Sequence, residues 1–221
     1  MTQDSPTETS ERALLFVMMD MPAEHDEEFN RWYAEEHLPE RANLPGFRTA
    51  RRFKAVAGEP PYLATYDLDS LAALETPEYK TLVSPPGEWT RRIGRLLNAN
   101  IRNVYTEQTP AHLPAGGHPD TAALLAVMLN VAPEHDAEVI DWYDNEHLPE
   151  RLACPGFLSA RRFSAVAGTN PRHLALYELT STGALETPEY QQVSGNPTGA
   201  TRRVLSLRQE GGRRNVYERI A

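Results

Sequence analysis

The 221-residue sequence has a single cysteine, Cys154, and it contains neither a Cys-x-x-Cys nor a His-x-x-x-His pair. One cysteine cannot form an intrachain disulfide, which excludes a disulfide-stapled secreted scaffold and makes the cytoplasm the expected compartment. Because the usual metal-ligand spacings are missing, no metal site is expected. Cys154 is expected to be a small buried hydrophobic residue, and a thiol nucleophile is the alternative.

Long hydrophobic runs are also missing. No apolar segment approaches the roughly 20 residues that cross a membrane, and the polar segment 1–11 lacks the apolar core of a signal peptide. No glycine-rich phosphate-binding loop is present. The net charge of −9 disfavours a nucleic-acid backbone as partner. We therefore expect a small-molecule substrate, and neither a membrane nor a nucleic acid as partner.

The chain contains an internal repeat. Residues 13–58 align with residues 123–168 at an offset of 110, and 28 of the 46 aligned positions are identical. The match resumes as ALETPEY at an offset of 111 and ends as RNVY at an offset of 112. Two copies are too few for a solenoid. The predicted organisation is a flexible tail (1–11), a first repeat (12–107), a Pro- and Gly-containing linker (108–121) and a second repeat (122–221).

Each repeat has the pattern of an α+β unit. Residues 13–21 form an apolar run of strand length, and an acidic segment then begins a helix predicted over 24–37. Pro39 disfavours helical geometry at Leu38, so this helix is expected to end near His37. The remaining predicted elements are strands at 47–56, 62–68 and 101–107 and helical regions at 70–79 and 89–97.

This order, βαββαβ, is that of a ferredoxin-like unit, in which two helices cover one face of a four-stranded sheet. The other face of such a sheet needs a cover, which a second copy in the same chain supplies. The predicted fold class is therefore α+β, with two tandem ferredoxin-like repeats that form one intramolecular barrel.

The segment Trp32-Tyr33-x-x-Glu36-His37-Leu38-Pro39, followed by Pro45-Gly46-Phe47, resembles the dimeric α+β barrel superfamily. Within the superfamily it is most similar to the EthD-like branch, here as a tandem fusion of two copies. The resemblance implies a pocket between sheet and helices, in a monomeric pseudo-dimer or a homodimer of it. Known members include cofactor-free monooxygenases, isomerases, cyclases, decarboxylases, haem enzymes and proteins without known activity. Only His37 and His147 carry over as site residues.

His37 and His147 are the first candidates for catalysis. Each follows a glutamate and lies four residues after a tyrosine, Tyr33 or Tyr143, so that imidazole and hydroxyl share one helix face. Histidine transfers protons near neutral pH. The C-terminal end of a helix stabilises imidazolium, which favours an acid or anion binder over a free base. The alternative is a structural role, as a helix cap or at the barrel seam.

Arg51-Arg52 and Arg161-Arg162 are candidates for substrate binding. Neighbours on a strand point to opposite faces, so one arginine of each pair is expected inside the barrel and the other on the helix side. An interior arginine needs an anion, either a substrate group or a protein carboxylate, and the structural ion pair is favoured. The expected protein partners are Glu36, Glu40, Glu146 and Glu150.

Further polar side chains lie on the third and last predicted strand of each repeat. They are candidates for lining a substrate pocket, although tyrosines in strands are more often packing groups. These residues are Tyr66, Tyr177, Asn103, Asn215, Tyr105 and Tyr217.

The expected function is that of a small-molecule enzyme without metal or organic cofactor, which transfers protons as an isomerase, cyclase or lyase. The alternatives are a non-catalytic small-molecule binding protein and a cofactor-independent monooxygenase. Haem, which some superfamily members bind through one histidine, is favoured by no sequence feature. The repeats differ at Phe29/Val139, Asn30/Ile140 and Arg31/Asp141, so one of the two pockets is expected to have kept the chemistry.

Overall fold

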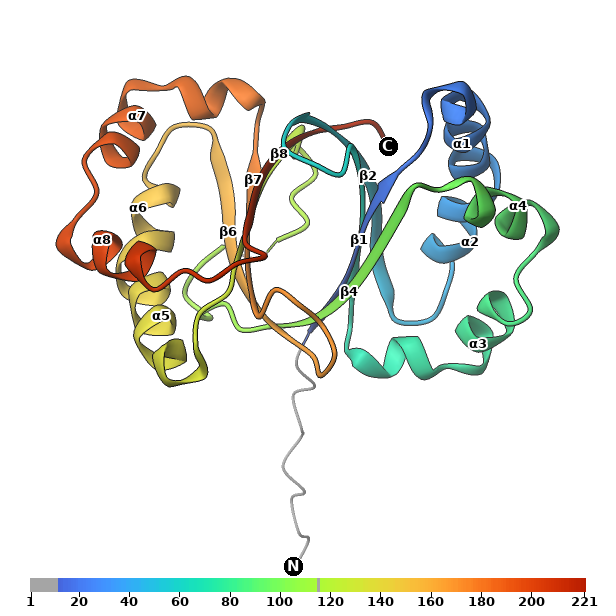
Figure 1. The fold of residues 1–221 in the computed structure, drawn as a ribbon, viewed down its shortest axis with the longest axis horizontal. Helices are drawn as coiled ribbons and strands as arrows, with labels where there is room; N and C mark the ends of the chain where they lie inside the picture. Colours follow the sequence, from blue (N-terminus) through green and yellow to red (C-terminus); the bar gives the residue numbers. More distant parts are fainter. Residues whose placement is uncertain (1–11, 115) are drawn as a thin grey trace, which may run out of the picture.

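The computed structural model describes residues 12–114 and 116–221, and the predicted tail 1–11 lies outside the described residues. Eight antiparallel strands close into one barrel in the order β1-β3-β2-β8-β5-β7-β6-β4. Helices pack on two opposite sides of this barrel, those of the first half of the chain on one side and those of the second half on the other (Figure 1). The expectation of an α+β barrel is confirmed.

The strands and helices of the first half, residues 12–107, follow the predicted order. They are β1 (Ala13–Asp20), α1 (Asp26–Trp32), α2 (Leu38–Ala42), β2 (Phe47–Ala57), β3 (Tyr62–Leu68), α3 (Pro77–Val83), α4 (Glu88–Leu96) and β4 (Ala99–Glu107). The second half, residues 122–221, contains β5 (Ala123–Leu129), α5 (Asp136–Trp142), α6 (Leu148–Leu152), β6 (Phe157–Ala165), β7 (His173–Leu179), α7 (Pro188–Gly195), α8 (Gly199–Ser206) and β8 (Arg213–Arg219).

Two seams join the halves. Strand β2 pairs with β8 around Phe53 and Arg219, and β4 pairs with β6 around Tyr105 and Ala165. Each half thus presents four strands whose two outer strands are both paired with the other half. Closure leaves no open sheet edge, which removes the main route to edge-to-edge association.

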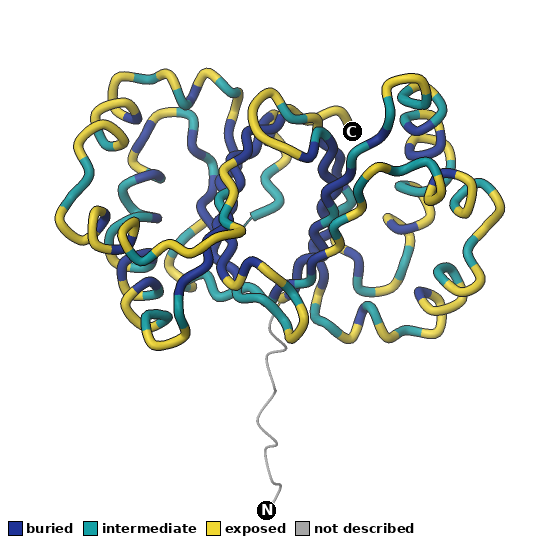
Figure 2. The backbone as a smooth tube through the Cα atoms, in the orientation of Figure 1, coloured by how far each residue is buried: buried dark blue, intermediate teal, exposed yellow. Residues whose placement is uncertain are grey.

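The strands carry apolar side chains on both faces. One set fills the barrel interior, as Phe16, Phe53, Tyr105 and Phe163 do, and two other sets pack under the outer helices. Figure 2 shows this distribution, with buried residues along the strands and exposed residues along the outer side of the helices. Both faces of the sheet are therefore core, which explains why β3 and β7 are buried at every position.

The first helix does not end near His37 as predicted. It continues as a π-helical turn over Tyr33–His37 and then as α2 to Ala42. In this turn the amide of Leu38 donates to the carbonyl of Tyr33, five residues back. A π-turn is wider than an α-turn, which makes room for the ring of Pro39 and tolerates its missing N–H. His37 consequently lies inside a continuous helical segment, and the second half repeats the arrangement over Tyr143–His147.

The turn that follows each of these helices requires glycine. Gly46 and Gly156 both have positive φ, 79° and 86°. A side chain at Gly46 would come within 2.8 Å of the Cβ of Ala73. The Pro-Gly turn therefore lets β2 start directly beneath the segment that leads to α3, which brings the two helical regions of each half together.

An ion cluster occupies one end of the barrel interior. Arg51 donates to Asp67 at 3.2 Å and to Glu178 at 2.8 Å, while Arg161 donates to the same two carboxylates at 2.6 and 3.4 Å. The predicted interior position of one arginine in each pair agrees with this geometry. The predicted partners Glu36, Glu40, Glu146 and Glu150 are wrong, because they belong to the outer helices, on the other side of the sheet.

The linker covers this cluster. The amides of Gly117 and His118 donate to the two carboxylate oxygens of Glu178 at 2.9 and 3.0 Å. A side chain at Gly116 would overlap the guanidinium of Arg161, so the linker backbone packs directly on that group. The segment predicted as a plain connection therefore closes one end of the barrel.

Candidate functional site

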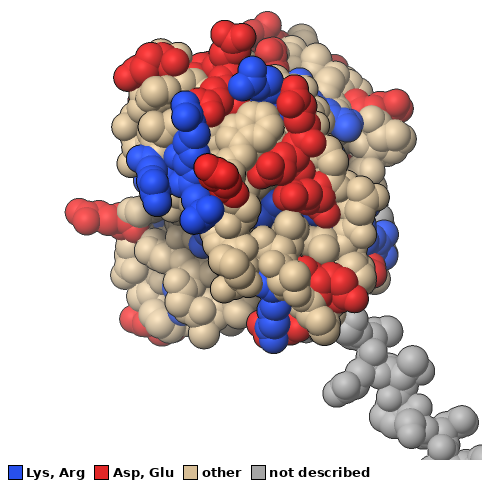
Figure 3. Space-filling view, turned by 90° about the vertical axis from the view of Figure 1, so that its right-hand side faces the viewer, with Lys and Arg blue, Asp and Glu red and all other residues tan. Residues whose placement is uncertain are grey.

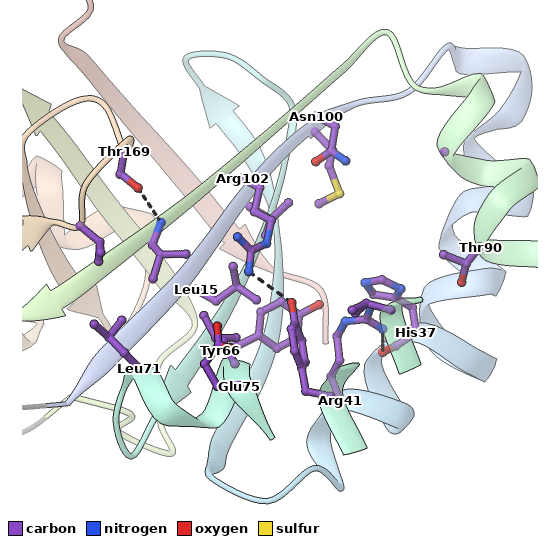
Figure 4. Close-up of a pocket in the computed structure, with 18 of the residues that line it drawn as sticks. Leu15, His37, Arg41, Tyr66, Leu71, Glu75, Thr90, Asn100, Arg102 and Thr169 are labelled. Carbon is purple, nitrogen blue, oxygen red and sulfur yellow. Dashed lines mark hydrogen bonds between the residues drawn. The ribbon is translucent and has the colours of Figure 1, made fainter. Parts of the chain in front are cut away.

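A cavity of about 940 Å³ lies in the first half, between the outer face of the sheet and the helices. Its apolar wall comes mainly from the strands and from α4, and its polar groups come from the turn Tyr33–His37 and from α2, β3 and β4. The loop between β6 and β7 completes the rim. The amide of Val166 in this loop donates to the carbonyl of Val104 on β4, and the amide of Val104 donates to Thr169 Oγ1 at 3.2 Å (Figure 4). The second half thus contributes to a site in the first half.

His37 lines this cavity from the π-turn. Its ring packs against Trp32 and Tyr33, with centroid distances of 4.0 and 4.8 Å. Its Nδ1 atom is buried and has no hydrogen-bond partner among the described residues. A buried ring nitrogen without a partner can bond to a ligand that displaces one of the side chains shielding it.

The His37 imidazole is neutral. Burial lowers its pKa well below the ordinary value, and the positive charges of Arg41 and Arg52 lower it further. The predicted stabilisation of imidazolium by a helix end is therefore wrong, because the helix continues past His37 and the desolvation of the ring dominates. A neutral imidazole can accept a proton, but the lowered pKa makes it a weaker base than a solvated histidine.

Two tyrosines lie beside the histidine. The Tyr33 hydroxyl donates to Met19 Sδ at 3.1 Å, and burial raises the Tyr33 pKa to about 12. The Tyr66 hydroxyl lies next to that of Tyr33, and among the described residues it has no hydrogen bond of ordinary geometry. Burial raises the pKa of Tyr66 well above 10. Both remain protonated at neutral pH, so neither acts as a base, and the Tyr66 hydroxyl is the one with a proton to donate to a ligand.

Two arginines that the sequence analysis did not select supply positive charge. Arg41 is only 8% exposed, lies one helical turn after His37 and donates to its carbonyl at 3.2 Å. Arg102 extends from β4 into the cavity and donates to the Tyr79 hydroxyl at 3.2 Å (Figure 4). The signal was available, since Arg41 and Arg102 recur in the second repeat as Arg151 and Arg214.

The equivalent region of the second half is packed differently. The ring of His147 stacks on Trp142 at 4.2 Å and meets the ring of Tyr177 edge-on at 6.3 Å. Leu148 is fully buried, whereas its counterpart Leu38 is only partly buried against the first-half core. Burial lowers the pKa of His147 to about 3, so this imidazole is neutral as well.

The arginine at the position of Leu97 in the second half is Arg208, and its charge acts on the buried Tyr143 hydroxyl. An apolar wall residue of the first site is thus replaced by a cation in the second.

The remaining predicted site residues fall into two groups. Arg52 and Arg162 lie on the helix side of the sheet, as the strand alternation predicts, and are discussed below. Two pairs point into the barrel, where the asparagine donates to the tyrosine hydroxyl two residues later and to a loop carbonyl of the opposite half. These pairs are Asn103 with Tyr105 and Asn215 with Tyr217.

Cys154 is buried and donates its thiol to the carbonyl of Glu150 at 3.4 Å. Burial raises its pKa. Both features agree with a small hydrophobic packing residue, since a reactive thiol needs exposure and a lowered pKa.

The surface charges, the possible metal ligands and the helix lengths can also be signs of function. Acidic and basic side chains are intermixed on the outer face of the first-half helices (Figure 3). Among residues 12–114 and 116–221, His, Cys, Asp and Glu nowhere form a group of three that could hold a metal ion. Within the same residues, every helix is too short or too polar to cross a membrane.

The buried neutral histidines make stability depend on pH. The unfolded chain binds protons at histidine below about pH 6.5, whereas folded His37 and His147 resist protonation. Stability is therefore fully present above pH 6.5 and is lost as pH falls toward their folded pKa values. We expect the free energy of unfolding in urea to decrease between pH 6.5 and 5 by at most about 1.4 kcal/mol per pH unit for each histidine.

In the variant His147→Asn, the contribution of His147 to the pH dependence of the free energy of unfolding should be lost, and that of His37 should remain. A free energy of unfolding that is constant over the same pH range would contradict the burial of neutral imidazoles.

No family model matches the chain, and no curated protein matches its sequence. Solved structures do match. An anthrone oxidase-like protein superimposes with a TM-score of 0.69 at 14% identity, covering 97% of this chain and 93% of the other. A monooxygenase candidate from Fusobacterium nucleatum gives 0.61 at 8% identity, covering 96% and 94%. A single-residue variant of chlorite dismutase from Candidatus Nitrospira defluvii gives 0.60 at 12% identity, covering 96% and 92%.

Identities this low establish a common fold and leave function open. The matches extend over nearly the whole of both chains, so the entire barrel with its two helical sides is shared. The chain has the fold of the dimeric α+β barrel proteins, realised as one closed eight-stranded barrel in a single polypeptide.

Proposed function

We propose that this protein is a small-molecule enzyme in which His37 accepts a proton from an apolar, ring-containing substrate. The observation that carries the proposal is the neutral imidazole of His37, whose Nδ1 has no protein partner among the described residues, at the wall of a large and mainly apolar cavity. A general base has to be unprotonated and within reach of the proton that it removes.

The negative charge that results on the substrate has two cationic neighbours. Arg41 is almost fully buried, and its nearest carboxylate, that of Glu40, lies 3.8 Å away on the exposed side of the helix. Arg102 has the neutral Tyr79 hydroxyl as its partner in the cavity. Preorganised cations stabilise an enolate or phenolate more than the neutral substrate, which lowers the barrier to proton removal. The hydroxyl of Tyr66 is the third candidate donor.

Two fates of the anion define two reaction classes. Return of the proton to another atom gives an isomerase, cyclase or lyase. Transfer of an electron from the anion to dioxygen gives a cofactor-independent oxygenase, and this second candidate is supported by neighbours described as anthrone oxidase-like and as monooxygenases. A binding protein without turnover would use the same cavity and the same contacts.

The duplicated sequence and the repeated order of elements support a finer assignment. We propose that residues 12–107 and 122–221 are two copies of one ferredoxin-like unit of the EthD-like type, fused in tandem, and that the first copy has kept the active cavity. The motif Trp-Tyr-x-x-Glu-His-Leu-Pro and the Pro-Gly turn occur in both copies. The two copies differ at a residue of the cavity wall, which is Leu97 in the first copy and Arg208 in the second.

Anthrone is a suitable probe, since its methylene group is acidic and its enolate reacts with dioxygen to give anthraquinone and water. Without oxygen and in D₂O, the enzyme should accelerate deuterium exchange at this methylene, measured by NMR. With oxygen, uptake in an electrode distinguishes the oxygenase. Saturable binding with neither exchange nor uptake would support the binding protein. The absorbance spectrum is recorded first, because a Soret band would contradict a cofactor-free reaction.

The variant Arg41→Met should lower kcat/KM for exchange by about 10- to 100-fold, the range expected for losing a hydrogen bond from a charged group. The methionine keeps most of the buried stem, so the fold should survive. Arg151→Met in the second half is the matched control and should leave kcat/KM within about twofold of the wild-type value, a factor worth well under 1 kcal/mol. Equal losses in both variants would contradict a site in the first half.

A further inference from the structure

The two copies of one arginine have different partners. On the helix side of the second half, Arg162 Nε donates to Asp144 Oδ1 at 2.8 Å and Arg162 Nη2 donates to Asp144 Oδ2 at 2.9 Å. This is a bidentate pair, the strongest geometry for binding a carboxylate. In the first half the corresponding arginine is Arg52, and the position of Asp144 is taken by Ala34.

The same edge of Arg52 is unoccupied. Its Nε and Nη2 atoms are buried and have no hydrogen-bond partner among the described residues. Its Nη1 atom donates to the neutral amide oxygen of Asn30 at 3.0 Å, and the guanidinium stacks on the ring of Tyr33 at 3.9 Å. The arginine is only 3% exposed, and within the described part of the chain no carboxylate forms an ion pair with it.

The surroundings leave the charge poorly compensated. Burial lowers the Arg52 pKa, and the neighbouring tyrosines and Asp26 oppose this only in part. Asp26 is engaged elsewhere, since it accepts from the Tyr62 hydroxyl at 2.6 Å and pairs with Lys54 at 3.4 Å. Burying a guanidinium edge without an anion costs free energy. A ligand that supplies an anion would form the missing ion pair and recover part of this cost.

A hollow of about 410 Å³ lies at this position. It is lined by Tyr33, Ala34 and Tyr62, by Asn30, Arg52 and Lys54, and by Ile220 and Ala221, whose backbone exchanges hydrogen bonds with that of Arg52. Two cations and flat aromatic walls describe a site for an anion with an apolar body. Because the two free nitrogens are shielded, the ligand has to displace a lining side chain, and Lys54 and Ile220 are exposed.

We propose that this hollow is a binding site for a small carboxylic acid, whose carboxylate takes the position that Asp144 occupies in the second half. The site is separate from the His37 cavity, with which it shares only Tyr33. It does not depend on the proposed reaction. Through Tyr33, a ligand there would touch one wall of the cavity.

Benzoate is the probe, and benzamide is its uncharged control. Isothermal titration with the full chain should show one saturable site for benzoate and none for benzamide. The variant Ala34→Asp places a carboxylate at the position equivalent to Asp144, so it should weaken benzoate binding by at least about tenfold and raise the melting temperature. Arg41→Met, which alters only the cavity, should bind benzoate as the wild-type protein does.

The reciprocal variant Asp144→Ala frees the Arg162 edge and should raise the benzoate stoichiometry from one to two. If this variant fails to fold, Ala34→Asp still decides the question. Undiminished binding by Ala34→Asp, or no saturable benzoate binding by the wild type, would overturn the proposal. Loss of binding in Arg41→Met would move the ligand to the cavity and overturn it as well.

Discussion

Replacing His37 by glutamine should lower kcat/KM for proton exchange by about 10²–10⁴-fold, the range expected when a general base is lost. Glutamine is similar in size and polarity but cannot accept a proton near neutral pH. Among the described residues of the cavity wall, the imidazole is the neutral base, since Tyr33 and Tyr66 stay protonated. Exchange is measured by NMR, with the circular dichroism spectrum as the test of folding.

His147→Gln is the matched control, because His147 occupies the same point of the corresponding π-turn, Tyr143–His147. Its neighbour Leu148 is fully buried, whereas Leu38 is only partly buried, and the His147 ring meets that of Tyr177 edge-on at 6.3 Å. We expect a change in melting temperature without a comparable loss of turnover. Equal and purely thermal effects of both variants would remove the histidines from the mechanism and favour the binding protein.

Replacing Glu178 by glutamine should lower the free energy of unfolding by about 3–5 kcal/mol, because it leaves buried charge uncompensated. Glu178 is fully buried and accepts from Arg51, Arg161 and Ser159 in addition to two linker amides. Neutralising it leaves Asp67 as the main counterion of two guanidinium groups inside the barrel. Urea unfolding at pH 7 measures the change.

Glu138→Gln is the control for this experiment. Its ion pair with Arg203 has a distance of 2.9 Å, and both side chains are about half exposed, so the loss should stay below about 1 kcal/mol. A comparably small effect of Glu178→Gln would mean that the interior cluster contributes little to closing the barrel.

Local pattern was sufficient for most of the fold. The strand at 62–68 has the predicted limits, and the alternation of Arg51 and Arg52 agrees with their opposite faces. The prediction that the first helix ends near His37 failed, because a proline rule describes an α-helix and a π-turn alters the geometry. Arg41 lies on the helical turn beyond the predicted end, so the predicted helix did not place it one turn after His37.

The partners of the interior arginines could not be derived from sequence. Glu178 lies 127 residues from Arg51 along the chain, and only the closure of the barrel places them 2.8 Å apart. The protonation of His37 was also misjudged, because the pKa of a buried group depends on desolvation by residues from several elements.

The sequence by itself determined that two segments of the chain are related in sequence, which elements each contains and which side chains share a face. These properties follow from turn residues, hydrophobic period and repeat identity, which act over a few neighbouring positions. Only the tertiary structure decided that the cavity lies in the first half, that the second half completes its rim through Thr169, and that Arg52 lacks the carboxylate held by Arg162. Such properties depend on packing between residues distant in the chain, where one difference, Ala34 at the position of Asp144, leaves an edge of Arg52 without a carboxylate.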